Sequence, residues 1–226
     1  DSQMSLLGGG ITSAGQLLNQ SGTTDVIALA VENQPETEVG YHFPYFMADL
    51  WILSLAPLRG GVIQWGMQLT GSGEENDGAG HFHALAEASP PGARGLICLP
   101  YFQGEKGTVH DPQARGLLAG MNPQHGREDL ARAILEGIAF SLRSVIESFE
   151  SEGFPVREIR VAGGGAQHLL FNQIKANVLQ RPIFALEVAL TGCLGVAAAA
   201  AVAKGYYSEL ASAAAAMSRG GEEVSP

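Results

Sequence analysis

The segment that most constrains the fold of this chain runs from residue 159 to residue 182. Ile159 and Val161 alternate with polar or small residues, which is the period of a β-strand. Apolar residues then recur at every fourth position, as in a helix, at Leu170, Ile174 and Val178. Between the two patterns stand three consecutive glycines, 163–165, whose bare backbone lets a flat or phosphorylated ligand approach a helix N-terminus. The same strand–turn–helix unit also serves a purely structural role in many α/β proteins, so both interpretations stay open at this point.

Length and composition narrow the class of protein. A chain of 226 residues with 46% hydrophobic residues and 30 glycines suits one compact α/β domain with many tight turns. The net charge of −10 argues against binding to the nucleic-acid backbone, which needs clustered Lys and Arg. Nucleotide binding is not excluded, because backbone amides and helix dipoles hold phosphates without basic side chains. Cys98 and Cys193 both lie in apolar runs and are predicted to be buried free thiols.

Targeting and membrane signals are missing from the sequence as given. It opens on Asp1 with no basic and apolar leader, and the alanine-rich run from Leu194 to Ala203 is too short to span a bilayer. We interpret that run as a buried helix that ends near Gly205. The prediction is a soluble cytoplasmic chain with no membrane partner.

Periodicity along the chain predicts a single α/β lobe. The strongest pattern is a helix over 128–151, with an apolar stripe from Leu130 to Phe149 and charged residues off it. A strand over 24–31 with apolar side chains on both faces is typical of the middle of a sheet. Weaker patterns predict a helix and Gly-rich turn over 1–18, helices over 60–69 and 82–88, strands over 95–99 and 183–186, and nothing definite over 41–56.

An ordered set of motifs accompanies the glycine turn. They are Gln20-Ser21-Gly22-Thr23-Thr24, Arg59-Gly60-Gly61-Val62-Ile63-Gln64-Trp65, Leu99-Pro100-Tyr101-Phe102-Gln103-Gly104-Glu105-Lys106, Asp111-Pro112-Gln113-Ala114-Arg115-Gly116 and Thr191-Gly192-Cys193-Leu194-Gly195. In this order and spacing the chain resembles the C-terminal lobe of the FGGY carbohydrate kinases, a family that includes xylulokinase, ribulokinase and glycerol kinase. The resemblance implies a ribonuclease-H-like, actin-type ATPase lobe with a mixed sheet flanked by helices.

The resemblance also implies a function. Residues 1–226 would form a single C-terminal ATP-binding lobe, with the N-terminal sugar-binding lobe absent from this chain. The activity would be ATP-dependent phosphorylation of a hydroxyl on a small sugar, ketose or polyol, with ATP and Mg²⁺ as cofactors and Mg²⁺ held mainly by phosphate oxygens. The lobe alone is expected to be inactive, and an apolar surface helix could pair two copies as a homodimer.

Residue by residue, the match implies a candidate site. Asp1 would be the general base that accepts the proton of the acceptor hydroxyl. The other matched residues would face the nucleotide: Gly22, Thr23 and Thr24 at the terminal phosphates, Gly60 and Gln64 near phosphate or ribose, and Gly164 and Gly165 against adenine and its ribose.

Two departures from the family pattern keep other functions open. Lys106 stands where the family has arginine, and Leu169 stands where its glycerol kinases have asparagine. The alternative is a degenerate, non-catalytic nucleotide-binding or scaffold lobe. A Rossmann-type dinucleotide enzyme is disfavoured, because the glycine turn lies late in the chain and lacks the Gly-x-Gly-x-x-Gly spacing. No zinc site is predicted, and the following histidines are expected in loops or on the surface: His42, His81, His83 and His110.

Overall fold

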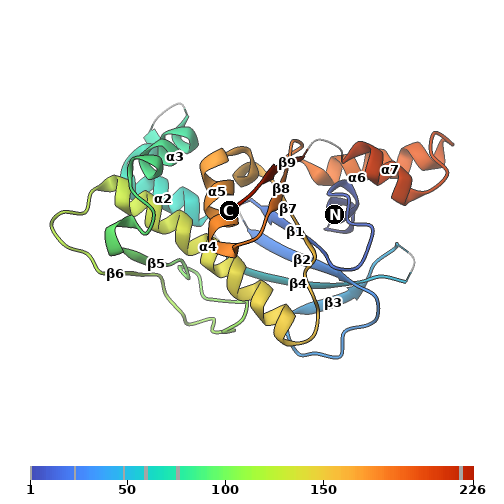
Figure 1. Cartoon of the computed structure of the whole chain (residues 1–226), viewed down its shortest axis with the longest axis horizontal. Helices are drawn as coiled ribbons and strands as arrows, with labels where there is room; N and C mark the ends of the chain where they lie inside the picture. Colours follow the sequence, from blue (N-terminus) through green and yellow to red (C-terminus); the bar gives the residue numbers. More distant parts are fainter. Residues whose placement is uncertain (1, 23, 48, 59–60, 75–76, 219–220) are drawn as a thin grey trace.

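A seven-stranded sheet forms the centre of the protein (Figure 1). The computed structural model describes residues 2–22, 24–47, 49–58, 61–74, 77–218 and 221–226. The strands lie in the order β3-β4-β2-β1-β7-β8-β9. Their bounds are β1 Gln16–Ser21, β2 Asp25–Val31, β3 Tyr41–Pro44, β4 Trp51–Leu58, β7 Glu158–Ala162, β8 Ile183–Leu186 and β9 Gly221–Val224.

The sheet is mixed, and β1 is where its two halves meet. On one side β1 pairs antiparallel with β2, which continues antiparallel to β4 and then β3. On the other side β1 pairs parallel with β7, and β7 pairs parallel with β8, before β9 closes the edge antiparallel. Parallel neighbours end at the same edge of a sheet, so the turns that follow β1 and β7 lie side by side. This confirms the predicted mixed sheet.

Helices bury both faces of the sheet. The helices are α1 Ser2–Gly8, α2 Val62–Thr70, α3 Gly78–Ala88, α4 Arg127–Ser151, α5 Leu169–Leu179, α6 Thr191–Ala203 and α7 Leu210–Met217. The C-terminal half of α4 packs Leu142 and Phe149 against one face of β1 and β2, together with Leu17 and Leu29. The other face is covered by α1, through residues such as Leu6. Successive side chains of a strand point to opposite faces, which explains why the predicted strand over 24–31 is apolar throughout.

The N-terminal half of α4 carries a second core. Ile134 and Ile138 pack with Phe82 of α3, Leu96 and Phe171 of α5. A two-stranded ribbon of β5 (Ile97–Leu99) and β6 (Leu117–Ala119) lies along the same half of the helix. Figure 1 shows α2, α3 and this ribbon at one end of the molecule and α6 with α7 at the other.

Several sequence predictions need correction. Residues 16–18 belong to β1 rather than to an N-terminal helix, and the unassigned region 41–56 contains β3 and most of β4. The alanine-rich helix α6 is mostly not buried, because only Thr191, Gly195 and Ala198 are inaccessible along it. Both cysteines are free as expected, but only Cys98 is buried and Cys193 is exposed. In the described ranges, no helix combines the length and the apolar character that crossing a membrane requires.

Candidate functional site

Three turns from distant parts of the sequence enclose one pocket of about 380 Å³. They are the turn after β1, the N-terminus of α2 and the 3₁₀ turn Gly164–Gln167 after β7. Helix α3 and the start of α5 close its remaining side. The lining residues are Ser21, Gly22, Gly61, Ile63, Gln64, Met67, Ala79, His83, Gly164, Gly165 and His168. Four of the predicted site residues are therefore brought together: Gly22, Gln64, Gly164 and Gly165.

The close approach of the two strand ends explains two of the three consecutive glycines. Gly163 has φ +87°, and a Cβ there would lie 2.3 Å from the carbonyl oxygen of Ser21. A Cβ on Gly165 would lie 2.5 Å from Ser21 Oγ. Both glycines are thus required by packing, because no side chain fits between the turns.

Unlike Gly163 and Gly165, Gly22 and Gly164 are not required to be glycine by packing. Among the described residues, a Cβ on Gly164 would meet no atom within 4 Å, and one on Gly22 would meet only the carbonyl oxygen of Thr24 at 3.8 Å. Neither residue has a positive φ that would demand glycine. Packing therefore leaves free space beside both residues, at the wall of the pocket.

The third turn brings the start of a helix to the pocket. Helix α2 begins after Gly61, which has φ 66° and makes no side-chain capping hydrogen bond. The Gln64 side chain lies over this residue, since a Cβ on Gly61 would meet its Oε1 at 2.5 Å. The first turn of α2 contains no acidic residue, so the positive end of the helix dipole is not neutralised there.

A buried polar network lies directly behind the turn after β1. Asn19 Nδ2 donates to Asp25 Oδ1 at 2.8 Å, and Lys175 Nζ donates to Asn19 Oδ1 at 2.8 Å. The Lys175 ammonium also lies 4.3 Å from the centre of the Phe171 ring. Burial raises the pKa of Asp25, an effect that the charge of Lys175 partly offsets, and burial lowers the pKa of Lys175 to about 8.

Asp25 also faces a small neighbouring cavity of about 20 Å³, room for one water molecule. Ser21 and Gly22 line this cavity as well as the main pocket. Asp25 Oδ2 is buried without a hydrogen-bond partner in the described part of the chain. The network therefore ends in an unsatisfied carboxylate oxygen next to the turn.

Two histidines form the opposite wall. His83 of α3 is 6% exposed, and its ring meets that of His168 edge-on with 3.7 Å between the ring centres. Burial lowers the pKa of His83 to about 4, with a further contribution from His168, so the imidazole is neutral at pH 7. The sequence prediction that His83 lies in a loop or on the surface is wrong. Its position on α3 next to α5 depends on packing that no local pattern reveals.

The other predicted residues fall into two groups. Thr24 is described and half-buried but is not among the lining residues. Asp1, Thr23 and Gly60 lie outside the described residues. Leu169, the departure from the glycerol kinases, is 69% exposed at the start of α5.

The Gly-Glu-Lys motif is a structural loop away from the pocket. Glu105 is buried and accepts backbone N–H groups from Gly107, Val109 and His110. Lys106 lines a separate groove with residues such as Tyr41. The exchange of arginine for lysine therefore does not alter the pocket between the glycine turns.

The side chains around the pocket offer few ligands to a metal ion. Across the residues that the structure describes, no three or more His, Cys, Asp or Glu side chains are grouped so that they could hold a metal ion. Asp25 is a carboxylate behind the turn after β1, and burial raises its pKa. A divalent cation here would depend on ligand oxygens rather than on a protein cage.

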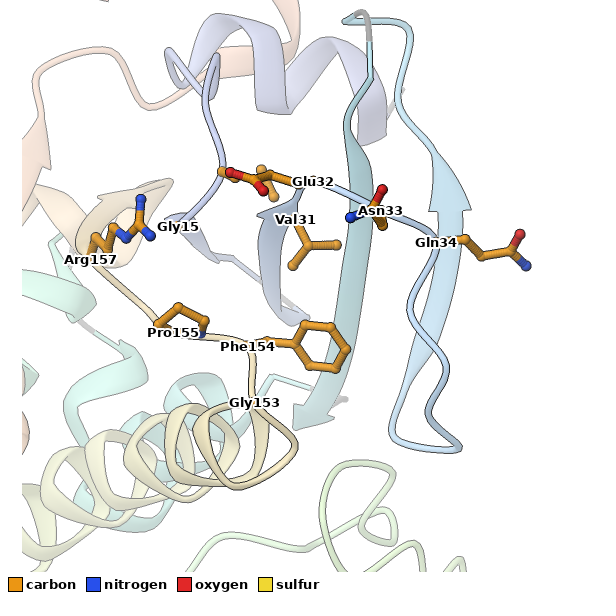
Figure 2. Close-up of a pocket in the computed structure, with 11 residues that line it drawn as sticks. Gly15, Val31, Glu32, Asn33, Gln34, Gly153, Phe154, Pro155 and Arg157 are labelled. Atoms are coloured by element: carbon orange, nitrogen blue, oxygen red, sulfur yellow. The ribbon is translucent and has the colours of Figure 1, made fainter.

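A second pocket, of about 240 Å³, lies at the opposite end of the sheet (Figure 2). It is formed where β1 begins and β2 ends, one strand length or about 20 Å from the glycine turns. Phe154 packs against the hydrophobic cluster that contains Val31, and Figure 2 shows Gln34 directed away from the other labelled residues. No lining residue carries a buried, unpartnered side-chain polar atom in the described structure. We therefore place the candidate site at the glycine turns.

Comparisons with known proteins agree with this geometry. Residues 17–204 match the family described as "FGGY family of carbohydrate kinases, C-terminal domain". The chain is 31% identical over 217 residues to the xylulose kinase of Bacillus subtilis, an alignment that covers 93% of this chain and 42% of that protein. The crystal structure of xylulose kinase from Rhodospirillum rubrum superposes with a TM-score of 0.89 at 30% identity, over 100% of this chain and 46% of that one.

A more distant structure shares the fold alone. Glycerol kinase from Plasmodium falciparum with ADP superposes with a TM-score of 0.84 at 20% identity, over 100% of this chain and 46% of that chain. The chain thus spans less than half the length of these relatives. The predicted actin-type α/β fold is confirmed, and the chain belongs to the FGGY family of carbohydrate kinases, whose C-terminal domain it matches.

Proposed function

We propose that this chain is the ATP-binding lobe of a kinase that phosphorylates a hydroxyl of a small sugar, ketose or polyol. The observation that carries the proposal is the free space beside Gly22 and Gly164. The two glycines stand on turns that meet at one pocket, and neither is needed by packing. Bare backbone at such turns suits the polyphosphate and ribose of a nucleotide.

Each predicted residue has a role in this proposal. Gly22 and Thr23 would face the terminal phosphates, with Thr24 behind them, while Gly60 and Gln64 would lie near phosphate or ribose at the dipole end of α2. Gly164 and Gly165 would pack against ribose and adenine. Mg²⁺ would be held mainly by phosphate oxygens, where it would neutralise charge on the transferred group.

Asp1 is proposed as the general base. Phosphoryl transfer asks little of a protein beyond positioning, electrostatic stabilisation and acceptance of the hydroxyl proton, and a carboxylate meets the last need. The sugar itself would be held mostly by the N-terminal lobe that the relatives possess. Closure of the two lobes would exclude water from the reacting phosphate.

The test separates binding from transfer. Calorimetry with the 226-residue chain is expected to show saturable ADP and ATP binding. Formation of ADP from ATP in the presence of a panel of ketopentoses, aldonates and polyols is expected to stay at background. In a protein carrying both lobes, Asp1→Asn is expected to lower turnover by about 10²-fold or more with ADP affinity unchanged. Asp49→Asn, an exposed position with φ 64° that asparagine tolerates, is the matched control.

The outcomes discriminate between the functions. Failure of the chain to bind any adenine nucleotide would refute the ATP-binding lobe. Sugar phosphorylation by these 226 residues alone would refute the two-lobe division of labour. Nucleotide binding without turnover in the two-lobed protein would favour the non-catalytic scaffold lobe. Homodimerisation and a cytoplasmic location remain predictions.

A further inference from the structure

The most unusual side chain in the candidate site is His83. It is more than nine-tenths buried, and neither Nδ1 nor Nε2 has a hydrogen-bond partner in the described part of the chain. Buried polar side chains almost always have a partner, so two orphaned nitrogens on one ring need an explanation. Because His83 also lines the pocket between the glycine turns, a ligand bound there would lie against this side chain.

The surroundings of His83 hold the ring in place without satisfying it. His168 meets it edge-on at 3.7 Å between ring centres, and Phe82 and Phe171 have ring centres 6.0 Å away. Asp77, the N-cap of α3, is the carboxylate that acts on it electrostatically. In the described part of the chain, none of these neighbours forms a hydrogen bond with the imidazole.

The wall near His83 suits a flat heteroaromatic ring. Met67 and Ala79 contribute apolar surface there, and the two imidazoles contribute aromatic edges and faces. The groups suited to binding phosphate are the backbone at Gly22 and the start of α2 at Gly61. They belong to other turns of the same pocket. A neutral imidazole offers one donor and one acceptor, which matches the mixed donors and acceptors on a purine edge.

We propose that His83 is a nucleobase-contacting residue, positioned by His168, which hydrogen-bonds the purine of the bound nucleotide. The inference rests on the proposed ATP site and adds the residue that recognises the base. Local sequence patterns give no sign of this role, since His83 and His168 are far apart in the chain and meet only through the packing of α3 beside α5.

The experiment compares a nucleotide with a polyphosphate that has no base. Calorimetry on the 226-residue chain would measure the Kd of ADP and of tripolyphosphate for the wild type, His83→Phe and His83→Gln. His83→Phe keeps a ring but removes both nitrogens, so ADP affinity is expected to fall about tenfold while tripolyphosphate affinity stays unchanged. His83→Gln, which restores a donor and an acceptor, is expected to recover part of the loss.

Controls keep the result interpretable. His42→Phe changes an exposed histidine of β3 outside the pocket and is expected to leave both affinities unchanged. A second readout needs no mutation: the imidazole ¹⁵N signals of His83 are expected to shift when ADP is added and not when tripolyphosphate is added.

The failures can be told apart. A wild-type chain that binds no ADP would remove the proposed site and this inference with it. ADP binding that is equal in the wild type and His83→Phe, with unshifted His83 signals, would overturn only the role of His83. Equal weakening of ADP and tripolyphosphate would show that His83 supports the fold of the pocket rather than the base.

Discussion

Two buried aspartates of this protein have opposite surroundings. Asp129, in the first turn of α4, accepts hydrogen bonds from Ser89 Oγ at 2.6 Å and from the backbone N–H of Gly126 at 3.0 Å. Asp25, beside the candidate site, accepts one from Asn19, and its other oxygen has no partner in the described structure. One carboxylate is satisfied and the other is not.

The pKa values follow from this difference. Burial raises the pKa of Asp129, but the bonds from Ser89 and Gly126 and the nearby Arg94 more than offset it, so the pKa ends below its usual value. Burial also raises the pKa of Asp25, and there Lys175, Asn19 and Ser21 compensate only in part. The same chemical group is thus stabilised as an anion at one place and disfavoured at the other.

The contrast extends beyond the two aspartates. Among the described residues, the buried side-chain atoms without a partner belong to Asp25, His83 and Asn172. His83 lines the pocket, Asp25 lines the cavity that adjoins it, and Asn172 donates to Ala166 directly after the glycine turn. These buried polar atoms without a hydrogen-bond partner thus lie in or next to the proposed ligand site. The carboxylate of Asp129, which only stabilises the fold, is paired.

The largest expected effect is the loss of stability on replacement of Asp129, the aspartate whose hydrogen bonds are complete. Asp129→Ala leaves the Ser89 hydroxyl and the Gly126 N–H without their acceptor in a buried place, so we expect the free energy of unfolding to fall by about 3 kcal/mol. Urea denaturation measures it. Glu147→Ala is the matched control on the same helix, since its ion pair with Arg143 is exposed and its loss should cost about 0.5 kcal/mol or less. If the two substitutions had equal effects, the buried hydrogen bonds of Asp129 would contribute no more stability than an exposed ion pair.

The substitution Lys175→Met tests the surroundings of Asp25, the aspartate with an unpaired oxygen. It removes the cation near buried Asp25, but it also removes the cost of burying an ammonium, so we expect a loss of about 2 kcal/mol at pH 7. Adding Asp25→Asn should recover most of that loss, because an uncharged amide needs no cation. Lys204→Met, at the exposed end of α6, is the control. No recovery in the double variant would mean that Asp25 and Lys175 are not coupled.

The pH dependence sharpens this test. Because the folded pKa of Asp25 is raised, the stability it contributes is complete below its unfolded pKa of 3.8 and is lost as pH rises through the folded value. Removing Lys175 raises the folded pKa of Asp25 further, so stability continues to fall over a wider range of pH. The deficit of Lys175→Met should therefore be smaller at pH 5 than at pH 7. Both pH values lie below the folded pKa of Lys175, about 8, so the lysine itself adds little change.

Local sequence patterns predicted the helix α4, the strand β2 and the glycine turn, because each has a strong period or composition of its own. They missed β1, the central strand, because it carries polar residues in buried positions. Asn19 is tolerated there only because Asp25 and Lys175 surround it, a contact between residues up to 156 positions apart. The site was predicted in part for the same reason: glycines mark turns locally, whereas the meeting of His83 with His168 depends on tertiary packing.

The proposed cradle at Gly164 gives the most direct test of the account. A Cβ there meets no atom of the described residues within 4 Å, so Gly164→Ala should change the free energy of unfolding by no more than about 0.5 kcal/mol. The added methyl group would occupy space reserved for the nucleotide, so the Kd for ADP should rise about tenfold, or about 1.4 kcal/mol. Gly73→Ala, which also has room for a Cβ but lies outside the pocket, should leave the Kd unchanged. A Gly164→Ala chain that binds ADP as tightly as the wild type would contradict the account.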